Sequence, residues 1–162
     1  MILGPSIAPF RPAASTPPQT TWAFFRWAVE GAWPGILWAT FWSAAAGSLE
    51  AISATILGRV VDAANTTAPE AVFQEHFWLF ALFLGFYLIL RPTVFGISTS
   101  ATSITLEPNL FPLILSRIHR WTIGQAVTFF DNDFAGRIAQ KQMQVARATT
   151  DVVSGAVETV AF

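Results

Sequence analysis

The sequence predicts an all-α membrane protein, a helical hairpin whose helices extend into the cytosol. Hydrophobic residues make up 53% of the 162 residues and charged residues 12%, whereas a typical soluble domain carries about 25% charge. The mean hydropathy is +0.50, and the apolar residues gather into two runs long enough for spanning helices. The 7 Trp and 15 Phe, beside a single Tyr, are typical of hydrocarbon and of membrane interfaces.

The composition also excludes several kinds of site. The formal net charge of -1 and the absence of a Lys/Arg-rich run argue against binding to nucleic acid. Without cysteine there is no disulfide, thiolate metal site or cysteine nucleophile. His76 and His119 have no second ligand at metal-binding spacing, so no metal site is predicted.

Residues 1–20 are predicted to form a disordered cytoplasmic tail. Proline removes the backbone donors that a helix needs. Half of the chain's ten prolines lie in this segment: Pro5, Pro9, Pro12, Pro17 and Pro18.

Residues 21–32 are predicted to form a short helix lying in the membrane interface. Arg26 and Glu30 are spaced for an i, i+4 ion pair beside the apolar face. The alternative is an ordinary amphipathic helix of a soluble core, but Pro34 leads directly into a long apolar run. The apolar residues at helical spacing are Trp22, Phe25, Val29 and Ala32.

Two spanning helices are predicted, over residues 33–61 and 77–106. Between Trp33 and Gly58 the single charged residue is Glu50, and a helix there is about 39 Å long at about 1.5 Å per residue. The second run reaches about 45 Å, which exceeds a hydrocarbon core of about 30 Å. Its excess is expected to project into the cytosol, with a bend at Pro92.

The distribution of charge predicts the topology. The loop of residues 62–76 carries Asp62, Glu70 and Glu75 but neither Lys nor Arg, whereas basic residues flank the pair of spans. By the positive-inside rule this loop lies outside and the N-terminus is cytoplasmic, in a membrane expected to be a bacterial inner membrane.

Residues 107–150 are predicted to form an intracellular loop, in which two helices flank a reversal at Asp131-Asn132-Asp133. A third apolar run covers residues 151–162. It is shorter than the ~20 residues that a spanning helix needs, so a third span is expected to begin there.

Glu50 and Arg91 lie inside the predicted spans, where a charge costs about 2.5–3.5 kcal/mol on insertion scales. One interpretation is that they line a substrate pathway or pair with each other. The other is that they lie near an interface or seal the packing between helices.

No nucleotide site or catalytic group is predicted. The phosphate-binding loop requires Gly-Lys-Ser/Thr after an upstream glycine, but the one lysine, Lys141, follows Gln140. The chain is therefore expected to bind no cofactor and to have no enzymatic activity on its own.

Two segments resemble ATP-binding-cassette (ABC) exporters. The stretch Phe-Phe-Asp-Asn-Asp-Phe-Ala-Gly-Arg-Ile-Ala-Gln-Lys, residues 129–141, is similar to their first intracellular loop, with Gly136, Arg137, Ile138 and Lys141 in the matching places. The end of the first span, Leu57-Gly58-Arg59-Val60-Val61-Asp62, also resembles that family. The chain is thus similar to the N-terminal part of a type-1 exporter transmembrane domain.

This resemblance implies a subunit with six spans and an ATPase domain that binds ATP and Mg²⁺, working as a homodimer or heterodimer. The loop would then dock on a nucleotide-binding domain of the same or the partner subunit. The alternative is that its aromatic residues only pack between the long helices. The implied coupling residues are Val127, Thr128, Phe129, Phe130, Asp131, Asn132, Asp133, Phe134, Gly136 and Arg137.

Two other functions fit the sequence. One is a standalone two-span protein that serves a larger membrane complex in a structural or regulatory role. The other is an inactive truncated fragment, which the short third run favours over a finished small protein.

Overall fold

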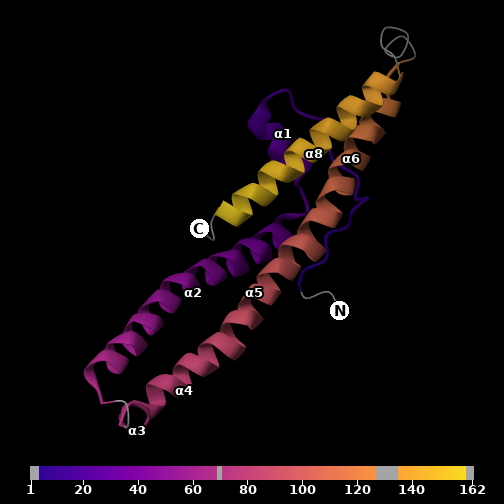
Figure 1. Ribbon diagram of the computed structural model, residues 1–162. Coiled ribbons are helices and arrows are strands. Elements are labelled where there is room, and N and C mark those ends of the chain that lie inside the picture. The colour runs from indigo at the N-terminus through magenta and orange to yellow at the C-terminus, as the bar shows by residue number, and fades with distance from the viewer. Residues whose placement is uncertain (1–3, 69–70, 127–134, 160–162) are drawn as a thin grey trace.

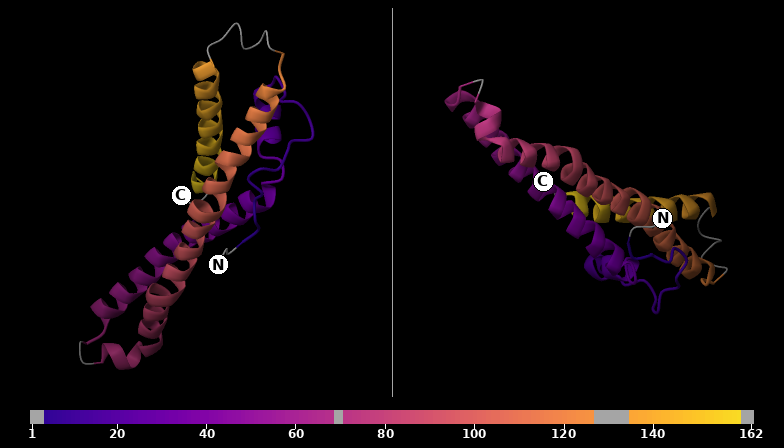
Figure 2. Two further views of the ribbon diagram at one scale, coloured as in Figure 1. Left: turned by 90° about the vertical axis from the view of Figure 1, so that its right-hand side faces the viewer. Right: turned by 90° about the horizontal axis from the view of Figure 1, so that it is seen from below.

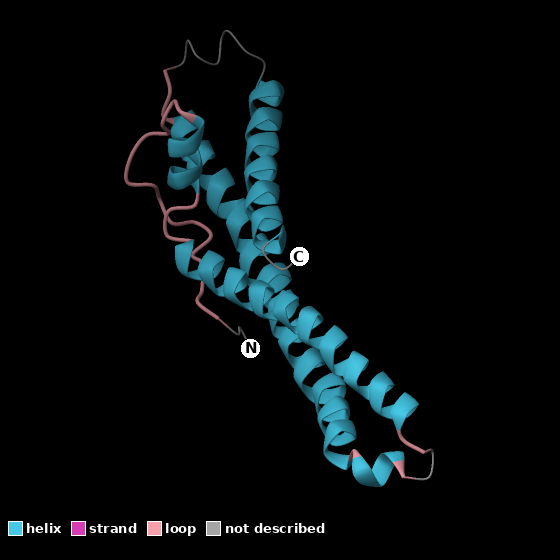
Figure 3. Cartoon of the chain, turned by 90° about the vertical axis from the view of Figure 1, so that its left-hand side faces the viewer, coloured by secondary structure: helices cyan, strands magenta, loops and turns pink. Residues whose placement is uncertain are grey.

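The computed structural model describes residues 4–68, 71–126 and 135–159. Within these ranges the chain folds into helices and connecting turns, without a strand (Figure 3). The predicted all-α fold is confirmed. Figure 1 shows an elongated molecule, with a helical hairpin at one end and a second pair of helices at the other.

The hairpin is formed by helix α2, Trp33–Thr66, and a longer helical arm, Phe77–Ile123. The two run side by side in opposite directions, and the one-turn helix α3, Val72–Glu75, lies at the tip (Figure 1). The second arm consists of α4 (Phe77–Gly85), η1 (Phe86–Leu90), α5 (Arg91–Ser100), η2 (Ala101–Leu106) and α6 (Glu107–Ile123).

Two π-helical segments, η1 and η2, interrupt the second arm, and each ends two residues before a proline. The N–H of Arg91 donates to the Phe86 carbonyl, and that of Glu107 donates to the Thr102 carbonyl, both across five residues. Pro92 and Pro108 have no backbone N–H to donate, so each interrupts the series of helical hydrogen bonds. The wider π-helical turn before each proline accommodates this interruption. A bend was predicted at Pro92; the structure places a change of helical register there without ending the helix.

The second helix pair consists of α6 and α8, Ala135–Thr159, which lie against each other in opposite directions (Figure 2). Helix α8 runs without a break through residue 150, where the sequence predicts the boundary between loop and third span. The helix therefore carries the chain from the tip of the α6–α8 pair back toward the hairpin.

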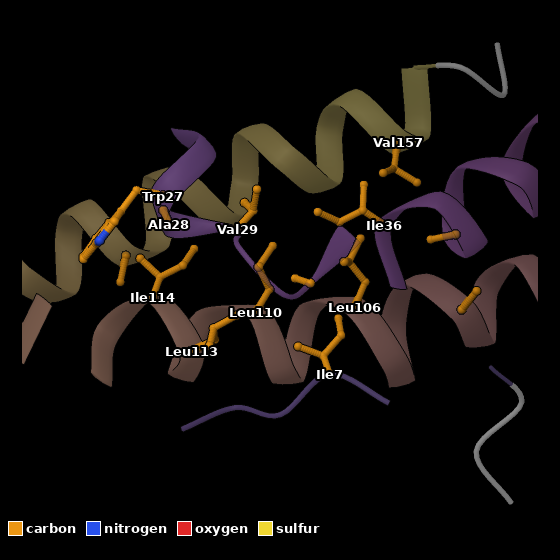
Figure 4. Packing of buried hydrophobic residues seen from close by; sticks show 14 residues of the cluster. Ile7, Trp27, Ala28, Val29, Ile36, Leu106, Leu110, Leu113, Ile114 and Val157 are labelled. Atoms are coloured by element: carbon orange, nitrogen blue, oxygen red, sulfur yellow. The ribbon is translucent and has the colours of Figure 1, made fainter. Parts of the chain in front are cut away.

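The main hydrophobic core lies where the hairpin meets the α6–α8 pair. Leu106, Leu110, Leu113 and Ile114 are the largest fully buried side chains, and they project from one face of η2 and α6 (Figure 4). Residues from four other segments pack against this face: Ile7 of the N-terminal segment, Ala28 of α1, Ile36 of α2, and Ala146 and Val157 of α8.

The structure differs from the predicted disordered tail, because residues 4–20 form an extended strap against α2 and α6. Ile7 is 5% exposed and lies directly over Gly35, where an added Cβ would come within 2.7 Å of the Ile7 Cδ1. The Ser116 hydroxyl donates to the Pro9 carbonyl at 3.4 Å, and the Trp27 indole donates to the Ser15 carbonyl at 2.8 Å. Proline prevents a helix here but does not prevent an extended segment from docking.

Helix α1, Thr21–Ala28, is shorter than the predicted 21–32. The chain turns at Gly31, whose φ of +82° favours glycine. Because the helix ends before Glu30, the expected i, i+4 ion pair between Arg26 and Glu30 does not form. That part of the prediction is wrong.

The hairpin buries little of its apolar surface. In the most apolar stretch of the second arm, only 6% of the residues are buried, and in that of α2, 22%. Between the main core and the tip, the arms pack through a small cluster of Leu49, Ile56 and Phe86. Both helices are long and apolar enough to cross a membrane, and they expose side chains that a soluble core helix would bury.

Candidate functional site

Two of the predicted coupling residues, Gly136 and Arg137, lie at the tip of the α6–α8 pair. Residues 127–134, which include Phe129 and Phe130, are outside the described residues. Gly136 and Arg137 occupy the first turn of α8 and are exposed. At the end of α6, Trp121 is 39% and Ile123 is 62% exposed. The described flanks therefore present apolar and basic side chains at an end remote from the hairpin (Figure 1).

An amphipathic face on α8 holds the α6–α8 pair together. Ile138, Gln142 and Ala146 are buried at intervals of four residues, as expected for a helix packed along one stripe. Nδ1 of His119 lies 3.3 Å from Oε1 of Gln142. The guanidinium of Arg147 lies 5.6 Å from the centre of the Phe111 ring, within the range of a cation–π contact. These contacts join α6 and α8 along most of the pair.

Arg117 of α6 ties the pair to α1 and to the N-terminal strap. Its side chain is 2% exposed. Nη1 donates to the carbonyls of Trp27 at 2.7 Å and Ala28 at 3.1 Å, and Nη2 donates to the carbonyl of Glu30 at 2.7 Å. Nε donates to the carbonyl of Arg11 at 3.2 Å. Because the last carbonyls of a helix lack partners within it, the guanidinium caps α1 from a neighbouring helix.

The two charges inside the hairpin face each other. Nη2 of Arg91 donates to both carboxylate oxygens of Glu50, at 2.7 and 3.0 Å. The pair joins α2 to the start of α5, and its side chains are 34% and 44% exposed. The rings of Tyr87 and Phe95, one turn to either side, lie 5.7 and 5.4 Å from the guanidinium carbon. The pairing proposed from the sequence is therefore present, while a role in a pathway stays a prediction.

A second polar contact lies one turn from the ion pair. The hydroxyl of Ser53 donates to the hydroxyl of Tyr87 at 3.0 Å, and that of Tyr87 donates to the carbonyl of Ser53 at 3.3 Å. The single tyrosine of the chain thus bridges α2 and η1 beside Phe86 of the small cluster. The hairpin arms are fixed in register by polar contacts as well as by packing.

A cavity of about 550 Å³ lies between α2, the α5–η2 region and the end of α8. Hydroxyls from three helices line it, and Glu158 supplies a carboxylate. None of these residues is among the predicted site residues. The run Ser-Thr-Ser-Ala-Thr-Ser at residues 98–103, inside an otherwise apolar helix, is the sequence signal for the lining residues of the second arm. The polar lining residues are Ser43, Ser98, Thr99, Thr102, Ser103, Glu158 and Thr159.

The histidines contact neighbouring polar groups. Nε2 of His76 lies 3.1 Å from the hydroxyl of Thr67, and His119 contacts Gln142. Across residues 4–68, 71–126 and 135–159, no group of three or more His, Asp or Glu side chains is placed to hold a metal ion.

The comparisons with known proteins relate the chain distantly to ABC transporters. Over 140 residues, 86% of the chain, it is 30% identical to a protein of Haemophilus influenzae named "Uncharacterized ABC transporter ATP-binding protein". The match covers 22% of that protein, so the chain spans about a fifth of the length of the curated relative it matches. No family model matches the chain. No solved structure matches it either.

Proposed function

We propose that this chain is the membrane-spanning part of an ATP-driven exporter subunit of the ABC class. In this role the hairpin forms part of a translocation pathway, and the α6–α8 pair reaches a nucleotide-binding domain. The observation that carries the proposal is the hairpin itself, whose most apolar stretches are 22% and 6% buried. Such an exposed apolar surface is stable in lipid, because lipid does not impose the free-energy cost of contact with water.

ATP chemistry is assigned to sequence outside this chain. No phosphate-binding loop occurs in the 162 residues, since Lys141 has no preceding glycine. ATP and Mg²⁺ would bind a nucleotide-binding domain of the same or the partner subunit. We assign the chain a mechanical contribution, which is supported by the packing of α6 against α8 and of α8 against α2 of the hairpin.

Topology labelling tests this proposal, and the absence of native cysteine makes the background clean. The variants Asn65→Cys and Asn132→Cys, expressed in bacterial cells, should respond oppositely to a membrane-impermeant maleimide. Cys at 65 is expected to react in intact cells, whereas Cys at 132 is expected to react only after the membrane is opened. Each variant should also stay in the membrane pellet after alkaline washing. The reverse labelling, or a folded chain in the supernatant without detergent, would refute the proposal.

The docking role is tested in a full-length transporter that carries this segment. Alanine at both Phe129 and Phe130 is expected to uncouple ATP hydrolysis from transport, because the aromatic anchor of the loop is lost. Transport should fall at least tenfold while hydrolysis by the detergent-solubilised protein persists. The control is Gln144→Ala, an exposed position of α8 outside the predicted coupling residues, which keeps both rings. Unchanged coupling in the double variant would remove the docking assignment and favour the alternative of a structural or regulatory two-span protein.

A further inference from the structure

An apolar groove of about 650 Å³ lies between α1, the start of α2 and the end of α8. Its walls are Trp22 and Phe25 from α1, Trp33 from α2, and Val152, Val153 and Ala156 from α8. Its floor includes Ile36 and Val157, which belong to the main core. The volume is within the range of about 300–1,000 Å³ that is usual for small-molecule sites.

The rim of the groove has the composition of a membrane interface. Trp22 is 84% exposed and Trp33 is 48% exposed, although both are large indoles. Tryptophan settles at the level of lipid headgroups, where the ring lies in hydrocarbon and the N–H reaches polar groups. The two indoles therefore place the mouth of the groove at headgroup level.

One positive charge, Arg26, stands at this rim. It is exposed, and the α1 helix ends before Glu30 reaches it, so the two form no ion pair. Arg117, which is also near α1, is instead committed to four backbone carbonyls. Arg26 is thus free to bind a phosphate, which the planar guanidinium does well.

We infer that the groove holds an acyl chain of an anionic glycerophospholipid, with the lipid phosphate bound by Arg26. The inference rests on the proposed membrane location of the chain. The apolar floor of the groove alone would fit any hydrocarbon chain. The positive charge of Arg26 at headgroup level is what favours an anionic lipid. With the expected cytoplasmic N-terminus, Arg26 faces the cytoplasmic leaflet, whose negative surface potential attracts basic side chains.

Native mass spectrometry of the full chain in detergent tests this inference, with phosphatidylglycerol and phosphatidylcholine as the added lipids. The unmodified chain is expected to retain one phosphatidylglycerol with about tenfold preference over phosphatidylcholine, the factor that about 1.4 kcal/mol produces. Arg26→Gln should abolish the preference while some binding of both lipids remains. Ala156→Phe, which fills the groove, should remove both.

The matched controls are Arg120→Gln, an exposed arginine of α6, and Ala139→Phe, an exposed alanine of α8 outside the groove. Both should bind lipid as the unmodified chain does, and circular dichroism checks that each variant is folded. Equal binding of the two lipids, or lipid retained by Ala156→Phe, would overturn the inference. So would a dimer that Ala156→Phe disrupts, because a second copy would then occupy the groove.

The maleimide labelling is carried out separately, on cells that express the Asn65→Cys and Asn132→Cys variants. A chain that inserts as expected but shows no lipid preference disproves only the lipid site. A chain that fails to insert disproves the proposed function as well.

Discussion

Replacing Arg117 by methionine is expected to lower the free energy of unfolding by about 3 kcal/mol, since it removes charge-assisted hydrogen bonds from a buried site. Methionine fills a similar volume but removes the donor to the carbonyls of Arg11, Ala28 and Glu30. The carbonyl of Trp27 also loses this donor but keeps the N–H of Glu30 at 3.4 Å. The lost hydrogen bonds connect α6 both to the N-terminal strap and to the end of α1. The midpoint of thermal unfolding, followed by circular dichroism in a mild detergent, should fall by roughly 6–12 °C.

Arg117→Lys separates charge from geometry. An ammonium keeps the positive charge but cannot present the guanidinium fork to carbonyls on different segments. We expect a stability between those of the unmodified chain and Arg117→Met. Arg120→Met, on the exposed side of the same helix, is the control and should change the midpoint by less than about 2 °C. If Arg117→Met were as stable as Arg120→Met, the hydrogen bonds of Arg117 would contribute nothing to the free energy of unfolding.

The long helices could be predicted because their signal is local. A long apolar run predicts a long helix by itself, and α2 and the second arm begin at the predicted positions 33 and 77. Their far ends were less predictable. Helix α2 continues to Thr66, past the predicted limit of 61, because nothing in that stretch stops a helix once it has formed.

The strap could not be predicted, because the surface that orders it comes from distant parts of the chain. The prolines of residues 1–20 indicate only that no helix forms. Ile7 can pack where it does because Gly35 has no side chain. The hydrogen bonds to the carbonyls of Pro9 and Arg11 come from Ser116 and Arg117, about one hundred residues later. No sequence pattern within residues 1–20 indicates these distant partners.

The candidate site was predicted unevenly for a similar reason. Glu50 and Arg91 are conspicuous in the sequence as charges in apolar runs. The hairpin places them together because Glu50 precedes the end of α2 at Thr66 by nearly as many residues as Arg91 follows the start of α4 at Phe77. The hydroxyl-lined cavity requires three helices, and single serines and threonines are common in spanning helices. Only their arrangement in space distinguishes Ser43 and Glu158 as neighbours of the 98–103 run.

The Glu50–Arg91 pair should show a coupling energy that depends on what surrounds the hairpin. In lipid, removing one partner leaves a lone charge, so Glu50→Ala or Arg91→Ala alone should cost about 3 kcal/mol. The double alanine variant leaves no charge and should cost less than the sum by at least about 2 kcal/mol. The exchanged pair, Glu50→Arg with Arg91→Glu, should recover most of the stability because it restores opposite charges.

The measurement is a double-mutant cycle in lipid bicelles, with unfolding by sodium dodecyl sulfate followed by far-ultraviolet circular dichroism. Ser48→Ala is the control, since its hydroxyl bonds only within α2, to the Ala44 carbonyl. The size of the coupling decides between the two interpretations of the pair. A value above about 2 kcal/mol belongs to a pair sealed in hydrocarbon, whereas a water-filled pathway screens the charges and leaves less than about 1 kcal/mol. No coupling, together with no loss from either single variant, would contradict a role of this ion pair in holding the hairpin.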